Sequence, residues 1–271
     1  MKITIYTRIP VTSPGGVETF VRTLHQQLQQ RGHDSEIIDA AYLGCSLSLP
    51  IPRVARIMAE DWKKRRQSRD IGLFNGECGM YAPRGRMVNV FHGTYTGRSL
   101  AYFWLRPLKS FLATFLLAGY QHWRAGVRNH CVAVSSSCAR QLAWLNLLPG
   151  ATVIQNGIDP QHFSPGDRTQ ARGELGFPQD KRIYFYASRV EVNKYPHFPS
   201  IWRDHLNADE MLVTATDQDL KLGSKVLSLV NVPHAQMLPL YRAADVFLMP
   251  TAYEGCSYAL IEAMSCGTIP V

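Results

Sequence analysis

The sequence predicts an α/β protein built from two Rossmann-like halves, each with a mainly parallel sheet. Three observations predict this fold. The chain opens with the β-branched run KITIYT, passes through a turn rich in proline and glycine, and enters a segment with apolar residues at helical spacing. Further apolar runs alternate with helical patterns, as in βαβ units. The alternation starts again after the turn-forming stretch NGIDPQHFSPGD, which is expected to join the halves.

The first half is expected to span residues 1–164. After its opening strand, a helix is predicted over VETFVRTLHQQLQQRGH, with Gly32 as the C-terminal stop. Four more strands are predicted, at SEIIDA, RMVNVFH, CVAVS and ATVIQN. Helices are predicted from Ser99 to about Arg128 and over SSCARQLAWL.

The second half, residues 165–271, repeats the alternation. The expected order is the strand RIYFYAS, a helix around HFPSIWRDHL, the strand EMLVTAT, a loop, the helix LPLYRAA, the strand DVFLMP and the helix SYALIEAM. Neither half contains a sequence repeat of the other, so the similarity between them is expected to be architectural.

The net charge is unevenly distributed along the chain. Residues 1–164 hold 19 Lys and Arg against 9 Asp and Glu, a surplus of +10, whereas residues 165–271 hold 10 against 12, or −2, which together give the formal net charge of +8. A basic half attracts nucleic acid, anionic lipid or an acidic small molecule, and charge alone does not choose among them. No nucleic-acid motif is apparent, so a nucleic-acid partner is not expected.

Targeting and redox signals favour a cytoplasmic protein. The opening residues alternate like a strand and lack the apolar core of a signal peptide. The most apolar stretch, FLATFLLAG, is far shorter than the roughly 20 residues of a membrane-spanning helix. The six cysteines form no C-x-x-C pair and no zinc-like set with histidine, so reduced thiols and no metal site are expected.

A glycine loop precedes the first predicted helix. Ser13, Pro14, Gly15 and Gly16 lie between a strand and a helix N-terminus, where backbone N–H groups and the helix dipole favour a phosphate. A tight turn without a ligand explains the same residues equally well. The loop does not match G-x-G-x-x-G, which argues against a nicotinamide dinucleotide enzyme.

Polar residues follow predicted strands in both halves. His92 comes directly after RMVNVF, at the edge of the sheet where α/β proteins bind ligands, although an isolated loop histidine is the simpler interpretation. Arg189 and Lys194 follow the first strand of the second half, and two cations there would suit a diphosphate. Most such side chains only solvate a surface, so this pair needs support from elsewhere.

The support comes from two acids near the end of the chain. Glu254 lies just before the last predicted helix and Glu262 in its third turn. Eight residues at about 1.5 Å per residue give roughly 12 Å, comparable to the span between the sugar and the ribose of a nucleotide sugar. Two solvated glutamates are the alternative, but the apolar neighbours of Glu262 indicate a specific partner for its carboxylate.

Taken together, these segments resemble the retaining GT-B glycosyltransferases of glycosyltransferase family 4. The resemblance covers nearly the whole chain through SPGGVETFVRTLHQQLQQRGH, VFHGTY, CVAVSSS, VIQNGIDPQHFSP, SRVEVNK, LPLYRAADVFLMPTAYEG and LIEAMSCGTIPV, in this order. It implies a GT-B fold of two Rossmann-like domains, with the nucleotide-sugar donor held mostly by the second and the acceptor by the first.

The resemblance assigns roles to particular positions. Gly15 and Gly16 match the glycine loop beneath the donor diphosphate, and His92 the histidine near the transferred sugar. Arg189 and Lys194 match the diphosphate-binding pair. Glu254 matches the acid facing the sugar and Glu262 the acid that binds ribose, while Gly255, Cys256 and Ser257 would place a helix N-terminus at the diphosphate. The catalytic set implied is His92, Glu254, Arg189 and Lys194. The family implies metal-independent transfer without a covalent nucleophile and no cofactor beyond the donor.

This sequence departs from the family pattern in three places, one of which is CGTIPV, with one residue more than the commoner CGTPV. Ser188 and Tyr195 stand where the family commonly has glycine, so the phosphate loop is expected to lie differently. The family also continues for roughly 80 to 100 residues beyond a position equivalent to Val271. A second domain cut short is therefore expected.

Two basic segments of the first half leave an alternative open. RVARIMAEDWKKRRQSR and FWLRPLKSFLATFLLAGYQHWRAGVR combine cations with apolar and aromatic residues. Either could lie on an anionic membrane surface, or could present a solvated basic face while its apolar side packs on the sheet.

The leading hypothesis is a cytoplasmic, peripherally membrane-associated enzyme. It would move a hexose from a nucleotide diphosphate sugar to a glycan or lipid-linked acceptor in cell-surface polysaccharide, lipopolysaccharide or glycolipid synthesis. A truncated, catalytically silent nucleotide-sugar-binding or scaffolding module is the first alternative, and a nucleotide-sugar epimerase on the same fold is the second.

Overall fold

The chain folds into two compact units, Met1–Asn156 (unit 1) and Gly157–Val271 (unit 2). The computed structural model describes residues 1–271 except residues 14, 106, 191–193 and 196. The sequence prediction drew the boundary after residue 164, whereas contacts within the structure divide the chain between Asn156 and Gly157. Both positions lie in the stretch NGIDPQHFSPGD. Pro14 of the predicted glycine loop and residues 191–193 of SRVEVNK lie outside the described residues.

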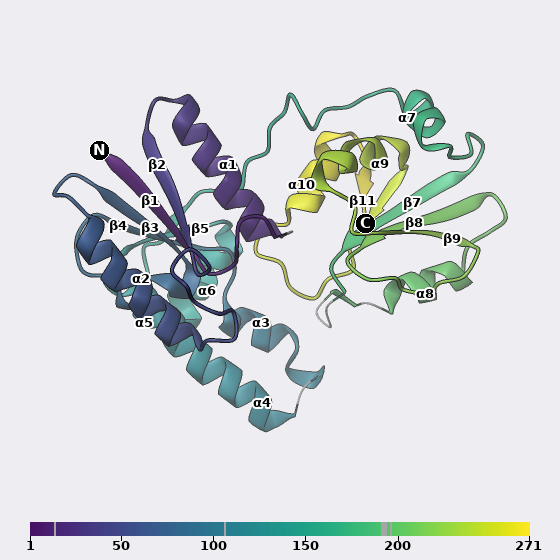
Figure 1. The fold of residues 1–271 in the computed structure, drawn as a ribbon. Helices are drawn as coiled ribbons and strands as arrows, with labels where there is room; N and C mark the ends of the chain where they lie inside the picture. The colour runs from purple at the N-terminus through teal and green to yellow at the C-terminus, as the bar shows by residue number, and fades with distance from the viewer. Residues whose placement is uncertain (14, 106, 191–193, 196) are drawn as a thin grey trace. The chain divides into compact units, whose positions relative to one another are not determined.

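Unit 1 is built on a six-stranded sheet with the order β2-β1-β3-β4-β5-β6 (Figure 1). Every strand pair in this sheet is parallel, as the sequence predicted. The strands are β1 (Lys2–Thr7), β2 (Asp34–Asp39), β3 (Ile71–Asn75), β4 (Met87–Phe91), β5 (His130–Ala133) and β6 (Thr152–Val153).

Alternation along β1 explains why helices cover both faces of this sheet. Ile3 and Ile5 pack against Val21 of α1 (Gly16–Gln30). Tyr6 points to the opposite face, where it packs with Met58 of α2 (Ile51–Arg65). Because successive side chains of a strand alternate between faces, a run of apolar residues builds a core on each side.

The remaining helices of unit 1 follow the later strands. They are η1 (Gly76–Tyr81), α3 (Tyr95–Ala101), η2 (Phe103–Leu105), α4 (Leu108–Ala113), the π-helix η3 (Thr114–Ala118), α5 (Gly119–Gly126) and α6 (Ser136–Leu145). The helical segment predicted from Ser99 to about Arg128 is therefore divided into several helices. Pro107 precedes α4 and cannot continue a helix begun upstream, so the long helical run starts only at Leu108.

Unit 2 contains a five-stranded parallel sheet with the order β11-β10-β7-β8-β9. Its strands are β7 (Arg182–Ser188), β8 (Glu210–Thr216), β9 (Val226–Val230), β10 (Val246–Leu248) and β11 (Ile269–Pro270). Its helices are α7 (Arg168–Leu175), α8 (Phe198–Asp204), η5 (His234–Gln236), α9 (Met237–Ala243) and α10 (Tyr258–Ser265).

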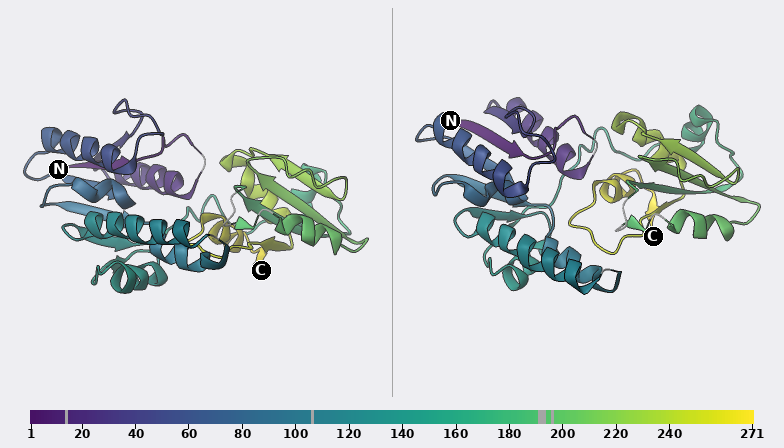
Figure 2. Two further views of the ribbon diagram at one scale, coloured as in Figure 1. Left: turned by 90° about the horizontal axis from the view of Figure 1, so that it is seen from below. Right: turned by 60° about the horizontal axis from the view of Figure 1, so that its bottom comes forward.

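Helices also lie on both faces of the second sheet (Figure 2). Phe185 and Phe247 pack with Tyr241 of α9 on one face, and Tyr184 packs edge-on against Trp202 of α8 on the other. Unit 2 is therefore a three-layer α/β sandwich in its own right, as the prediction of two Rossmann-like halves requires.

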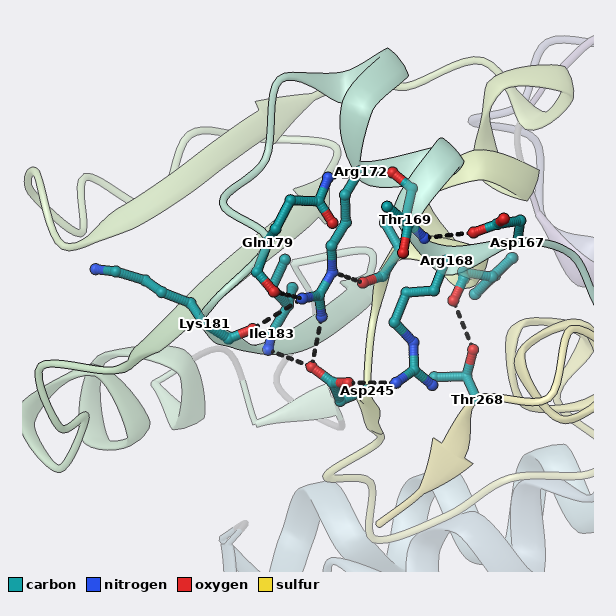
Figure 3. Close-up of polar contacts among 11 residues, drawn as sticks. Asp167, Arg168, Thr169, Arg172, Gln179, Lys181, Ile183, Asp245 and Thr268 are labelled. Atoms are coloured by element: carbon teal, nitrogen blue, oxygen red, sulfur yellow. Dashed lines mark hydrogen bonds and ion pairs between the residues drawn. The ribbon is translucent and has the colours of Figure 1, made fainter.

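An ion-pair network at the amino-terminal edge of this sheet ties α7 to the strands (Figure 3). Arg172 of α7 donates to Asp245 at 2.7 Å and to the carbonyls of Ala243, Gln179 and Lys181. The other carboxylate oxygen of Asp245 accepts from Arg168 at 2.7 Å. The helix itself begins where the Asp167 side chain caps two backbone N–H groups and ends at Gly176, whose φ of 68° is left-handed.

Among the residues that the structure describes, no helix is both long enough and apolar enough to span a bilayer.

Candidate functional site

The carboxyl edge of the unit 2 sheet gathers three of the residues singled out in the sequence. Arg189 directly follows β7, Lys194 lies five residues later, and Glu254 follows β10. Strands β7 and β10 are parallel neighbours, so their carboxyl ends reach the same edge. There the Lys194 ammonium forms an ion pair with Oε1 of Glu254, and both side chains remain about a quarter exposed, at 22% and 25%.

Lys194 is predicted to bind an anion beside this ion pair. The Lys194 side chain is 22% exposed, and its ammonium carries three N–H donors. A phosphate oxygen could therefore approach the same cation from its exposed side, while Glu254 keeps oxygen atoms for sugar hydroxyls. Arg189, which is exposed on the preceding loop, would add a second positive charge.

The loop that carries Lys194 is held by contacts that the sequence did not reveal. The Tyr186 hydroxyl donates to the carbonyl of Lys194 at 3.2 Å, and the Val190 N–H donates to Asp217 Oδ1 at 2.6 Å. Tyr195 adopts a φ of 45°, in the left-handed region that favours glycine. The backbone thus keeps a glycine-like conformation at one of the two positions where the family commonly has glycine.

The N-cap of α10, Ser257, lies three residues after Glu254 in the chain. Gly255 and Cys256 lead into Ser257, whose side chain caps the helix by accepting from the Leu260 N–H at 3.4 Å. The Ser257 hydroxyl therefore has a structural role, as the N-cap of α10. Backbone N–H groups at this helix end, with the helix dipole, are the kind of donors that meet phosphate groups in α/β proteins.

Glu262 is 3% exposed and has two partners in unit 2. Its Oε2 accepts from the Tyr241 hydroxyl at 2.9 Å, and its Oε1 lies 2.7 Å from Nε2 of His234. Burial and the neighbouring carboxylate raise the pKa of Tyr241 well above its usual value, so the hydroxyl stays protonated and donates. These two contacts engage both oxygens of a nearly fully buried carboxylate, and the binding of a ribose by Glu262 stays a prediction. Neither Tyr241 nor His234 was singled out in the sequence, where Tyr241 belongs to the predicted helix LPLYRAA and His234 to the loop before it.

The other predicted residues belong to unit 1. Helix α1 begins at Gly16 with Gly15 before it, and the carboxylate of Glu18 lies so close to Gly15 that a side chain there would collide with it. Glu18 is buried in the first turn, where the helix dipole favours its charge. An anionic ligand at this helix end would meet a carboxylate already present, so the helix dipole alone does not favour a phosphate here. The donor-binding role of Gly15 and Gly16 stays a prediction.

His92 lies directly after β4, as predicted. Its Nε2 lies 3.0 Å from Oδ1 of Asn75, and its ring packs edge-on against Phe20 at 4.7 Å. Desolvation lowers the pKa of His92 to about 4, so the ring is neutral at pH 7. A neutral imidazole can exchange hydrogen bonds with sugar hydroxyls, but it supplies no positive charge to a phosphate.

A second polar cluster of unit 1 was not predicted from the sequence. The Tyr95 hydroxyl donates to Glu77 at 3.1 Å, and the His122 ring stacks on Tyr95 with its Nε2 3.9 Å from Glu77. Burial raises the pKa of Glu77 and lowers that of His122 to about 4. No sequence signal connects residues so far apart, because the strands β3 and β4 and the helix α5 bring them together only in the fold.

Among the described residues, no group of three or more His, Cys, Asp or Glu side chains is arranged to hold a metal ion. Metal independence stays a prediction from the family resemblance.

Comparisons with known proteins define the class to which this fold belongs. The structure is similar to the sucrose-phosphate synthase of Thermosynechococcus elongatus, with a TM-score of 0.79, 15% identity, and coverage of 99% of this chain and 80% of that one. It is also similar to Anabaena HepE solved with UDP and glucose, with a TM-score of 0.68, 16% identity, and coverage of 100% and 80%. At these identities the likeness establishes the GT-B fold.

Sequence comparison identifies the family. The model of Glycosyltransferase Family 4 matches residues 14–162, and that of Glycosyl transferases group 1 matches residues 210–271. The chain belongs to glycosyltransferase family 4.

Two curated relatives are enzymes of inositol phosphate glycosylation. The D-inositol 3-phosphate glycosyltransferase 1 of Catenulispora acidiphila is 30% identical over 138 residues, which cover 42% of this chain and 33% of that protein. The D-inositol 3-phosphate glycosyltransferase of Mycobacterium tuberculosis is 30% identical over 134 residues, or 43% and 27%. The match therefore spans a third or less of these relatives.

Proposed function

We propose that this protein transfers a hexose from a nucleotide diphosphate sugar to a glycan or lipid-linked acceptor, with retention of anomeric configuration and without a metal ion. The observation that carries the proposal is the Lys194–Glu254 pair at the carboxyl edge of the unit 2 sheet, with the N-cap of α10 three residues after Glu254 in the chain. The neighbouring HepE structures with UDP and glucose and with UDP-glucose support a donor of this class.

In the proposed mechanism the donor diphosphate is the leaving group. Negative charge grows on it as the bond from the sugar carbon to the phosphate oxygen breaks, so Lys194 and Arg189 stabilise the transition state more than the bound donor. The acceptor hydroxyl attacks from the face that the diphosphate leaves, and its proton passes to a phosphate oxygen. Glu254 holds sugar hydroxyls and Glu262 the ribose, and neither forms a covalent bond. His92, neutral at pH 7, would orient the transferred sugar.

Titration calorimetry with UDP and ADP tests the donor site directly. Loss of a charge-assisted contact is worth roughly 1.5–3 kcal/mol, so Lys194→Ala should weaken the binding of the preferred diphosphate about tenfold to a hundredfold. Arg189→Ala should act in the same direction. Lys225→Ala, which removes another exposed lysine of unit 2, should leave affinity unchanged. Wild-type affinity in both site variants would refute the assignment.

A transfer assay with different acceptors tests the proposed acceptor class and the proposed pathway. Radiolabelled transfer from the preferred nucleotide sugar to glycan and to lipid-linked acceptors, with and without EDTA, should yield product of retained configuration at an unchanged rate. We further propose that the protein works at the cytoplasmic face of the cell membrane, in the synthesis of a cell-surface polysaccharide or glycolipid.

A further inference from the structure

An unusually apolar surface covers one helical run of unit 1. Its large side chains are 44% to 69% exposed and belong to Phe103, Trp104, Leu108, Leu112, Leu116, Leu117 and Tyr120, which we call the apolar helix surface. The helices α4 and η3 within this run contain no buried residue. Figure 1 shows α4 at the far end of the run, beyond the strands of its own unit. Apolar side chains gathered in this way usually mark a contact with a partner or a membrane.

The segment of sequence that contains this surface carries charge of one sign. Residues 78–158 contain eight Lys and Arg and no Asp or Glu, so this segment alone carries +8, equal to the formal net charge of the whole chain. Lys109 lies on α4 and is exposed, and Arg128 is exposed just beyond α5. Acidic side chains of this chain are therefore absent from the segment in which the apolar surface lies.

The π-helical turn keeps the exposed leucines on one side of the run. Residues 108, 112, 116 and 120 are spaced by four, and in a straight α-helix each such step drifts by about 40°, or about 120° over three steps. The turn η3 has hydrogen bonds that join residues five apart, so it winds more slowly and reduces this drift. Leu108, Leu112, Leu116 and Tyr120 consequently form a narrower stripe than an uninterrupted helix would allow.

The other basic segment of unit 1 does not share these properties. In α2 the apolar residues Val54, Met58 and Trp62 are 0% to 2% exposed, because they pack against the sheet. Its outer face offers lysines and arginines without apolar side chains to insert. The structure thus separates two segments that looked alike in the sequence.

We propose that the apolar helix surface inserts into the interface of an anionic phospholipid membrane, with Trp104 and Phe103 at the level of the lipid headgroups. Aromatic and leucine side chains beside lysine and arginine, without acids, are what such an interface attracts. A protein partner would need an apolar face rimmed with acids, whereas a bilayer supplies both properties in one surface. The use of this contact to reach a lipid-linked acceptor rests on the proposed function, but the contact itself does not.

Vesicle co-sedimentation tests the contact without donor or acceptor. The wild-type protein should bind vesicles containing phosphatidylglycerol, and bind phosphatidylcholine vesicles much more weakly. Salt should weaken the binding, because it screens the lipid charge. The double variant Leu116→Glu/Leu117→Glu keeps good helix formers and should reduce the partition coefficient at least about tenfold. Ile201→Glu, at a 58% exposed position of α8 in unit 2, is the matched control and should bind like the wild type.

Each outcome has a clear meaning. Fluorescence of Trp104 should be quenched by brominated lipid, and Trp104→Phe should abolish that part of the quenching. Circular dichroism of the variants checks that they fold. Absence of wild-type binding, or unchanged binding by the leucine double variant, would overturn the proposal. A wild-type dimer that the double variant converts to a monomer, with no vesicle binding, would assign the surface to self-association instead. The diphosphate titration does not depend on vesicle binding. The proposed donor site and the proposed membrane contact can therefore be refuted separately.

Discussion

At the scale of single residues, Glu254 has two opposing effects in the proposed site: its carboxylate binds the sugar, but its negative charge opposes binding of the diphosphate. It faces Lys194, the cation proposed to hold the diphosphate, and so lowers the positive charge that the diphosphate meets. Glu254→Gln should leave UDP affinity unchanged or raise it, because Lys194 loses its competing anion, while transfer falls at least about a hundredfold for want of a sugar-binding carboxylate. Calorimetry and a transfer assay on the same variant separate the two effects. A parallel loss of UDP binding would assign Glu254 a structural role at Lys194 instead.

His122 carries a pH dependence of stability whose sign follows from its burial. Its pKa is about 4 in the folded protein and about 6.5 in the unfolded chain, so the unfolded chain takes up the proton first as pH falls. The stability from the neutral ring is complete above about pH 6.5 and is lost as pH falls towards 4. Glu77 acts in the opposite sense, because its raised pKa lets the folded state bind a proton above the usual range.

His122→Phe isolates this contribution while keeping a ring against Tyr95. Between pH 6.5 and 4.5 the wild type should lose stability relative to the variant by up to about 1.4 kcal/mol per pH unit. Urea unfolding at several pH values measures the difference. Identical pH slopes in the two proteins would contradict a neutral, buried His122.

At the scale of elements, the sequence predicted most strands but missed those with weak signals. The strands β1, β4, β7 and β8 were predicted because their apolar runs are bounded by turn residues. β3 and β9 were missed, because Gly72 interrupts the apolar run of β3, and β9 pairs with a single neighbour at the edge of its sheet. The helices α2 and α7 were not assigned, although Asp167 and Gly176 mark both ends of α7.

The attachment of α7 provides a test at this scale. Asp245 accepts from Arg172, Arg168 and the Ile183 N–H, and Arg172 has almost no exposed side-chain surface. Asp245→Asn should destabilise unit 2 by about 3 kcal/mol, because a buried guanidinium loses its charged partner. Urea denaturation measures the loss. Asp209→Asn, an exposed residue at the same edge of the sheet, should change stability by less than about 0.5 kcal/mol.

At the scale of the whole molecule, each unit has its own sheet and cores, so ligand binding should be visible unit by unit. Hydrogen exchange with saturating UDP should slow most in unit 2, around β7, β10 and α10. At 100 times its dissociation constant a ligand stabilises by about 2.7 kcal/mol. Slower exchange at residues 15–18 as well would support the predicted glycine loop in unit 1. Protection confined to unit 1 would contradict the donor assignment.

The sequence by itself determined the α/β class, the two parallel sheets and the family, because apolar periodicity and short motifs are local properties. It also located Lys194 and Glu254 at strand ends, since the order of elements places such residues at the same edge of a sheet. Only the tertiary structure decided which partners these residues have. Tyr241 and His234 meet Glu262, Glu18 lies against Gly15, and α2 buries the apolar residues that the helical run of α4 exposes. Except for Glu18 and Gly15, which are three residues apart, these contacts join residues distant in the chain, and packing across a fold leaves no regular signature in the order of its residues.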